Sequence, residues 1–565
     1  MTDLLSQPDE KRKGFYILFE AMLEASSRAD GKFVQDIYLE GRLADQAKYT
    51  GGIDDDSMLE LLKSCEGFRR LVHSIGVSVR SLEGSQSEVR FTLENWGKTS
   101  KYESGSRISA ICPADGSEVV MKLSDYSWTS EDDVLGKFTF EFEQAGALAI
   151  ANVVFYLHDG YDAPELIADE PVAFDSDAYR SMISRSLLHK GNNYRLKKAI
   201  EKAKQGEDVT IAYIGGSITQ GAGAKPIHSA CYAYQSYLSF KKLFAKNGGE
   251  HIHFVKAGVG GTPSELGMIR YERDVLKDGA VWPDIVIVEF AVNDADDETR
   301  GKCYESLVLK ALAAENEPAV ILLFSVFIND WNLQDRLAPV GLHYDLPMVS
   351  VKDAVVPQFH LSKEAGHVVT KRQYFYDSYH PTNIGHTIMA DCLGWLFAEA
   401  EYSELHERDI DLSKPPIIGN DFAHVRLLDR STNTAIAEIA KGAFHETDTD
   451  LQMVEMNDQP FATAQFPHNW MHTAEAGNES FKLKLKSRSL LLVYKDSGSN
   501  DFGRADIFVD GKLVQTADPR IINWTHCHAT ILYNEPEARE HTIEIQMAPG
   551  DEHKRFTILA FGYVS

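Results

Sequence analysis

The feature that most constrains this chain is an alternation of apolar, β-rich runs with helical segments between about Asn192 and Glu401. The runs are Val209–Ile214, His253–Val255, Asp284–Phe290, Ala319–Phe327 and Pro347–Val351, and the helical segments lie around Tyr232–Lys246, Tyr304–Glu315 and Thr382–Glu399. Strands that alternate with helices form βαβ units, whose parallel sheet is covered by helices on both faces. We therefore predict an α/β domain with a parallel sheet over residues 191–405.

Both flanks of this block have a different pattern. From about Gly76 to Pro171, short period-two runs such as Val89–Leu93 and Lys137–Phe142 are separated by Gly, Ser and Asp clusters, which is typical of an antiparallel β-sandwich. Ahead of it, Gly14–Ala25 and Asp56–Cys65 are interpreted as helical. These patterns predict a first domain over residues 1–190 that combines helices with a β-sandwich.

Short β runs return after a linker at Asp411–Pro416. Asp510-Gly511 lies between two of these runs and is a hairpin turn signal. We predict a C-terminal β-sandwich over residues 406–565.

Composition restricts the partners and the compartment. The chain has 565 residues with 57 Lys+Arg and 84 Asp+Glu, and the net charge of −27 argues against a nucleic-acid partner because it repels phosphate. No run reaches the ~18 apolar residues of a membrane span, and Phe15–Phe19 is shorter than the apolar core of a signal peptide. The six scattered cysteines form no C-x-x-C pair and indicate reduced thiols. We expect a cytoplasmic protein without a membrane partner.

The first motif with chemical meaning runs from Ile211 to Gly221, where a strand enters Gly215-Gly216 and then Ser217. A serine at this strand-to-helix turn has a free backbone N–H, which can stabilise an oxyanion while the hydroxyl acts as a nucleophile. A phosphate-binding loop or a plain turn remains an alternative, although no Gly-Lys-Ser/Thr follows.

Two further motifs follow the next strands. Ala257–Thr262 is rich in glycine, and Gly261, or its neighbour Gly260, can bring a backbone N–H close to a ligand. Asn293 follows the run at Asp284–Phe290, and its amide can donate into a site. A tight turn and an Asn-Asp turn, respectively, are the alternatives.

The fourth motif, Tyr376–His386, contains Asp377 three residues before His380. Such an aspartate can fix the tautomer of the histidine and support its imidazolium form. A solvated or core histidine is the alternative. All four motifs lie at or just beyond the carboxyl ends of predicted strands, where open α/β sheets bind ligands.

The order Ser217, Gly261, Asn293 and Asp377/His380 resembles the four blocks of the SGNH (GDSL-type) hydrolases over about residues 205–400. The chain departs from many members at Gly216, where they have Asp, and in this it resembles some carbohydrate esterases. The resemblance implies a three-layer α/β/α domain with Ser217 as nucleophile, His380 as general base and acid, and Asp377 orienting it. The N–H groups of Ser217 and Gly261 and the amide of Asn293 would form the oxyanion hole, with no metal or cofactor.

The flanking β-sandwiches resemble accessory domains of carbohydrate acetylesterases. This resemblance implies a serine acetylesterase acting on acetylated xylo- or manno-oligosaccharides. A lipid or thioester acylhydrolase, a catalytically silent carbohydrate-binding protein and a nucleotide-binding domain are the competing hypotheses. The sequence does not define the oligomeric state, and it is compatible with a homo-oligomer.

Other residues of the chain are candidates for binding a metal or a sugar. A zinc site is conceivable at His526-x-His528, with His468 and His472 in the same block, but the chemistry requires no metal and no cysteine pair supports one. The indoles of Trp331, Trp470 and Trp524 have faces suited to stacking on sugar rings, although core packing is the favoured interpretation for each of them individually.

Overall fold

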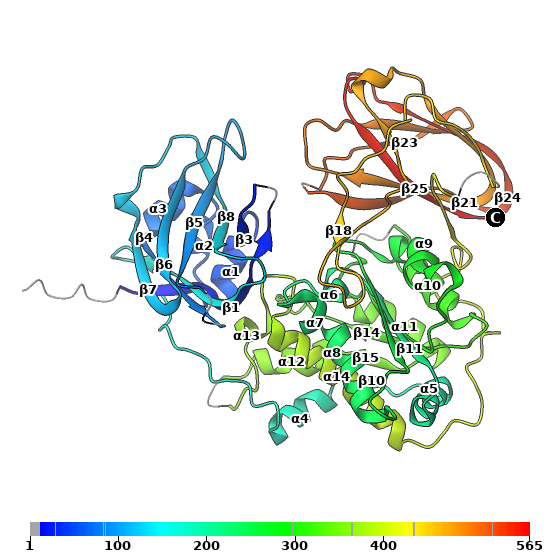
Figure 1. Cartoon of the computed structure of the whole chain (residues 1–565), viewed down its shortest axis with the longest axis horizontal. Coiled ribbons are helices and arrows are strands. Elements are labelled where there is room, and N and C mark those ends of the chain that lie inside the picture. Colours follow the sequence, from blue (N-terminus) through cyan, green and yellow to red (C-terminus); the bar gives the residue numbers. More distant parts are fainter. Residues whose placement is uncertain are drawn as a thin grey trace, which may run out of the picture.

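The computed structural model describes residues 12–565 except 29, 83, 85, 296–297, 363–364, 433–435 and 523. Figure 1 shows three parts: an N-terminal β region (14–157), a central α/β region (177–402) and a C-terminal β region (426–564). Both β regions stand on the same side of the central region (Figure 1). No described helix is long and apolar enough to cross a membrane.

The N-terminal β region consists of two antiparallel sheets, ordered β1-β9-β4-β7 and β2-β3-β8-β5-β6, around one shared core. Its elements are β1 (Gly14–Glu24), β2 (Ser26–Ser27), β3 (Phe33–Tyr38), α1 (Leu43–Tyr49), α2 (Asp56–Leu61), α3 (Cys65–Leu71), β4 (Val72–Ser81), β5 (Glu88–Gly97), β6 (Arg107–Pro113), β7 (Asp115–Lys122), β8 (Asp132–Phe142) and β9 (Leu148–Leu157). The helix predicted at Asp56–Cys65 is present as α2, capped by the side chain of Asp55.

The helix predicted at Gly14–Ala25 is wrong, because this segment is strand β1, paired antiparallel with β9. Most of β1 is buried, and side chains on both faces are covered. A strand covered on both faces shows an unbroken apolar run rather than alternation, so its pattern does not distinguish it from a helix.

The central α/β region contains a six-stranded sheet ordered β10-β15-β14-β13-β11-β12. Its strands are β10 (Leu187–His189), β11 (Val209–Gly215), β12 (Ile252–Gly258), β13 (Ile285–Glu289), β14 (Ala319–Phe324) and β15 (Met348–Ser350). Strands β11 to β15 pair in parallel, as predicted, but the edge strand β10 pairs antiparallel with β15. The sheet is therefore mixed.

Helices cover both faces of this sheet. They are α4 (Asp177–Ser184), α5 (Tyr194–Gln205), α6 (Ser217–Gln220), α7 (Ile227–Ala230), α8 (Tyr232–Phe244), α9 (Ser264–Asp274), α10 (Lys302–Leu312), α11 (Gln334–Tyr344), α12 (Val351–Phe359), α13 (Lys371–Tyr374) and α14 (Asn383–Tyr402). One core cluster lies between the sheet and α5, α8, α12 and α14. A second cluster contains α9, α10 and α11 and continues into the C-terminal β region.

The described strands of the C-terminal β region form one eight-stranded antiparallel sheet and a short hairpin. They are β16 (Arg426–Leu428), β17 (Glu438–Ala440), β18 (Met453–Val454), β19 (Thr463–Ala464), β20 (Trp470–His472), β21 (Phe481–Asp496), β22 (Ala505–Val509), β23 (Lys512–Ala517), β24 (His526–Met547) and β25 (Phe556–Val564). The turn predicted at Asp510-Gly511 joins β22 to β23. The long strands β21 and β24 stay paired through register shifts, and such bulges let a sheet bend without dividing into two.

The coarse architecture is therefore as predicted: an α/β region flanked by β-rich regions. Eight strands of the C-terminal region are hydrogen-bonded in one sheet, and the β-sandwich layout of this region stays a prediction. The domain boundaries at 190/191 and 405/406 stay predictions.

Candidate active site

The four predicted motifs meet at one edge of the central sheet. Strand β11 lies between β12 and β13, and all three run parallel, so the residues that follow their carboxyl ends are neighbours. Ser217 follows β11, Gly261 follows β12 and Asn293 follows β13. The chain reverses direction across the sheet at β11, and ligands bind at such switch points in open α/β sheets.

Ser217, His380 and Asp377 form a continuous hydrogen-bonded chain. The Oγ of Ser217 lies 2.9 Å from Nε2 of His380, and Nδ1 of His380 lies 2.9 Å from Oδ2 of Asp377. The loop that holds Asp377 and His380 precedes α14, which Thr382 caps. The geometry is that of a nucleophile, a base and an orienting carboxylate.

Asp377 is held in its ionised form. Its Oδ1 accepts from the backbone N–H groups of Tyr379 and His380, both at 2.8 Å, and Nη1 of Arg42 lies 3.2 Å from its Oδ2. Burial opposes ionisation, but the neighbouring His380, its hydrogen bond and Arg42 outweigh burial and lower the pKa of Asp377 to about 2. The carboxylate is therefore charged at neutral pH.

Gly216 allows Asn293 to approach the nucleophile. A Cβ on Gly216 would lie 2.2 Å from Oδ1 of Asn293, so any side chain there would displace the amide. In this structure, glycine at position 216 is therefore required by the position of the Asn293 amide.

Gly261 occupies the left-handed region with φ of +70°, which glycine adopts without strain. Its N–H has no hydrogen-bond partner among the described residues. A Cβ on the preceding Gly260 would lie 3.7 Å from Cβ of Ser217, so this loop runs beside the nucleophile.

A cavity of about 480 Å³ opens over these groups, and all three parts of the chain line it. Its walls include Ser217, Gly261, Asn293 and His380 from the centre, with Arg42 from the N-terminal β region and Leu451–Met453 and Trp524 from the C-terminal β region. Its apolar lining is provided by Phe327, Tyr379, Leu451, Met453 and Trp524. The loop containing β18 reaches down to α6 (Figure 1).

The tryptophans and histidines that were candidates for binding a sugar or a metal lie in different environments. Trp524 lines the cavity, whereas Trp470 is fully buried in the C-terminal core and Trp331 stacks on Phe327. His526 and His528 lie with Asp496 in a cluster whose ligand atoms are within 4.8 Å of one another. His472 is bonded to two carbonyls elsewhere in the C-terminal β region, and His468 is exposed.

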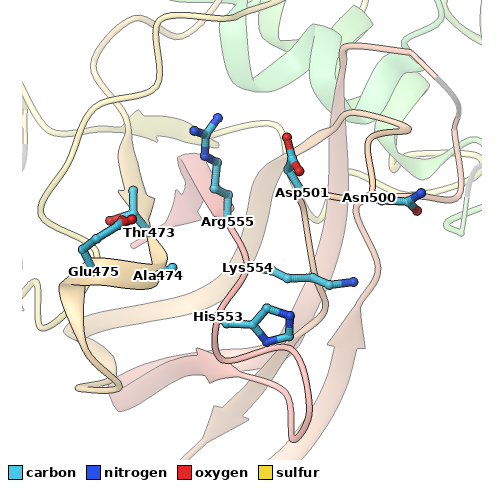
Figure 2. Close-up of a pocket in the computed structure, with 8 residues that line it drawn as sticks. All are labelled: Thr473, Ala474, Glu475, Asn500, Asp501, His553, Lys554 and Arg555. Carbon is cyan, nitrogen blue, oxygen red and sulfur yellow. The ribbon is translucent and has the colours of Figure 1, made fainter. Parts of the chain in front are cut away.

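A second cavity, of about 410 Å³, lies in the C-terminal β region (Figure 2). It is lined by Thr473, Ala474, Glu475, Asn500, Asp501, His553, Lys554 and Arg555. Its lining includes charged groups of both signs, but no hydrogen bond in it joins a hydroxyl to an imidazole among the described residues. It does not provide the arrangement found at Ser217.

Sequence reasoning missed Arg42 and Gln452, and it named Trp524 only as one of three tryptophans that could stack on a sugar. Arg42 is separated from Asp377 by 335 positions in the chain, and Gln452 from Gly260 by 192. No local motif marks them, because only the packing of the β regions on the central region brings them to the site.

Comparisons with known proteins agree with this geometry. Residues 213–388 match the model of the GDSL-like lipase/acylhydrolase family. A structure titled "a two-domain esterase (CEX) active on acetylated mannans" is similar with a TM-score of 0.57 and 26% identity, covering 68% of this chain and 99% of that chain. A second structure of CEX, co-crystallised with mannopentaose, gives a TM-score of 0.56 and 26% identity, with 68% and 98% covered. No curated protein matches the chain.

The fold and site define a hydrolase of the serine ester-hydrolase class. The segment 213–388 matches the GDSL-like lipase/acylhydrolase model, in agreement with the resemblance that its motifs predicted. The protein is a carboxylic ester hydrolase, and its structural neighbour CEX is an esterase active on acetylated mannans.

A buried acid beneath the site provides a stability prediction. Glu289, at the end of β13, is fully buried, accepts hydrogen bonds from Ser325 and Thr219, and has a pKa that desolvation raises from 4.5 to about 7. Between these two values the unfolded chain binds fewer protons than the folded one, so stability falls as pH rises. The loss amounts to about 3 kcal/mol once the pH exceeds the folded-state pKa.

We therefore expect Glu289→Gln to raise the melting temperature relative to the parent more at pH 8 than at pH 5, measured by thermal unfolding. Glu305→Gln is the matched control. Glu305 is also buried, but its oxygens accept from the backbone N–H groups of Ile417, Ile418 and Gly419, so its loss destabilises at both pH values. An identical shift for Glu289→Gln at the two pH values would contradict the prediction.

Proposed function

We propose that the protein is a carbohydrate O-acetylesterase that removes acetyl groups from plant-polysaccharide oligosaccharides, with manno-oligosaccharides as the first substrate class and xylo-oligosaccharides as the second. The observation that carries the proposal is the Ser217–His380–Asp377 chain beneath a cavity with an aromatic lining. The similarity to CEX, at 26% identity over 68% of this chain, supports mannan as the polymer.

In this proposal the reaction proceeds through an acyl-enzyme. Oγ of Ser217 attacks the acetyl carbonyl carbon while its proton moves to Nε2 of His380, 2.9 Å away. The oxyanion is stabilised by the N–H groups of Ser217 and Gly261 and by the amide of Asn293. The tetrahedral intermediate then collapses, and the sugar alkoxide leaves with the proton from His380. Water, deprotonated by His380, releases acetate by the same steps in reverse order.

The cavity fits a sugar better than a long acyl chain. It is open, and Trp524 and Tyr379 at its wall are 43% and 37% exposed, so part of each ring is accessible to the C–H surface of a pyranose. Ser217 lies in the same cavity as these rings, which suits a short acyl group on a sugar chain that lies across the opening.

The test is acetate release from acetylated manno-oligosaccharides and acetylated xylo-oligosaccharides, together with hydrolysis of 4-nitrophenyl acetate and a long-chain 4-nitrophenyl ester. We expect release from the mannan series and preference for acetate over the long chain. Preference for the long-chain ester would favour the lipid or thioester acylhydrolase. If neither oligosaccharide series released acetate, the proposal of a carbohydrate substrate would be wrong.

Replacing Trp524 tests the sugar platform. We expect Trp524→Ala to raise KM for acetylated manno-oligosaccharides about tenfold, because it removes a stacking surface worth about 1 kcal/mol or more. The KM for 4-nitrophenyl acetate changes much less, since that ester has no sugar chain. Trp282→Ala is the control, because Trp282 is 49% exposed but lies outside the cavity lining. Equal effects of Trp524→Ala on both substrates would argue against stacking.

The six cysteines are free and buried, which supports the proposal of a reducing, cytoplasmic location.

A further inference from the structure

Both carbonyl groups of the Gly260–Gly261 loop are held by side chains of the C-terminal β region. Nε2 of Gln452 donates to the carbonyl of Gly260 at 2.8 Å, and Nε2 of His526 lies 2.9 Å from the carbonyl of Gly261. On the other side, the N–H of Gly260 donates to Oε1 of Gln220 in α6 at 3.0 Å. The loop is therefore fixed between the nucleophile helix and the C-terminal β region.

The hydrogen bond from Gln452 also sets the direction of the Gly261 N–H. The Gly260 carbonyl and the Gly261 N–H belong to one trans peptide group, in which they point in opposite directions. Because Gln452 holds the carbonyl toward the C-terminal β region, the N–H is directed away from that region. This is the N–H that has no partner among the described residues.

His526 fixes the next peptide group in the same way. A carbonyl oxygen only accepts, so Nε2 of His526 must carry the proton in its contact with Gly261. Nδ1 of His526 lies 3.1 Å from Oδ2 of Asp496 on the adjacent strand β21. His526 is 3% exposed and Asp496 is fully buried, so the ring is locked in orientation by a buried partner.

Trp524 restricts the loop further. A Cβ on Gly261 would lie 2.9 Å from Cζ2 of Trp524 and 3.2 Å from Cδ2 of His526. The Cα of Gly261 therefore packs directly on this part of the C-terminal β region, which leaves the loop little freedom to rotate its peptide groups.

We infer that Gln452 and His526 are positioning residues: Gln452 fixes the peptide group that carries the Gly261 N–H, and His526, oriented by Asp496, fixes the peptide group that follows it. Together they hold the Gly261 N–H toward the oxyanion of the reaction. The C-terminal β region is thus part of the catalytic framework, in addition to its contribution to the cavity wall. This inference rests on the proposed function, because the oxyanion forms only in acyl transfer at Ser217.

The test compares His526→Ala, His526→Gln and His541→Ala with the parent enzyme on 4-nitrophenyl acetate. His541 is the matched control, since it lies on the same strand β24, is 1% exposed and is bonded to Asp510 at 2.8 Å. It contacts no residue of the Gly260–Gly261 loop among the described interactions.

For His526→Ala we expect kcat to fall about 10²-fold with KM nearly unchanged, because a misplaced donor weakens only the transition state. We expect His526→Gln to recover most of this loss, since its amide can donate to the Gly261 carbonyl. His541→Ala is expected to lower the melting temperature to a similar degree as His526→Ala but to leave kcat within about threefold of the parent.

Two outcomes would overturn the inference while leaving ester hydrolysis at Ser217 intact. One is an equal loss of kcat in His526→Ala and His541→Ala. The other is a stoichiometric metal ion in the purified protein that is lost in both His526→Ala and His528→Ala, because a metal would then replace the hydrogen bond as the partner of the ring. Failure of the proposed function is recognised separately, by full turnover in Ser217→Ala.

Discussion

Replacing Ser217 by alanine is expected to reduce kcat for 4-nitrophenyl acetate and for acetylated manno-oligosaccharides by about 10⁵-fold or more. The Oγ of Ser217 is the only protein atom of the proposed mechanism that forms a covalent bond to the acyl group, and it is 2.9 Å from Nε2 of His380. The oxyanion donors and the cavity remain in the variant, so a small residual rate above the water reaction is expected.

The double variant Ser217→Ala/His380→Ala tests whether the nucleophile and the base act together. Because nucleophile and base act as one unit, its kcat should be no lower than that of either single variant. Ser236→Ala is the control: Ser236 is a buried serine of the same region that bonds to the Tyr213 hydroxyl, away from the cavity lining. Undiminished turnover in Ser217→Ala, with acyl-enzyme still trapped in a rapid quench, would remove Ser217 from the mechanism.

The second large effect is expected at Asn293. Loss of one oxyanion donor typically lowers kcat by about 10²–10³-fold, and we expect this for Asn293→Ala with little change in KM. Asn293→Asp should be impaired at least as much, since a carboxylate keeps the shape of the side chain but accepts instead of donating and repels the oxyanion.

Steady-state kinetics on 4-nitrophenyl acetate measures both Asn293 variants. Asn316→Ala is the control, because the amide of Asn316 donates to the backbone carbonyl of Pro283, and this asparagine is absent from the cavity lining. A rise in KM at constant kcat would show that Asn293 binds the ground state instead of the oxyanion.

The sequence carried enough information to predict the central site. Ser217, Gly261 and Asn293 each follow a strand, and parallel strands bring their carboxyl ends to one edge, so local patterns were sufficient to predict that these groups meet. Asp377 and His380 are three positions apart, and their contact is local. Their roles in catalysis remain predictions that the variants above test.

The contributions of the β regions could not be predicted in this way. His526 is 265 positions from Gly261 in the chain, and Arg42 is 335 positions from Asp377. Their placement depends on how whole regions pack, and no periodicity or spacing in the sequence encodes that packing. The strand β1 was misassigned for a related reason, since tertiary burial of both faces removes the alternation on which strand prediction depends.

The hydrophobic cluster shared by the central and C-terminal regions has a consequence for how this enzyme evolves. Side chains of α9 and α10 pack in the same cluster as Leu491, Val493 and Leu559 of strands β21 and β25. If the C-terminal region were exchanged for that of another enzyme, the new strands would have to match the apolar side chains of α9 and α10, and these helices would have to match the new strands.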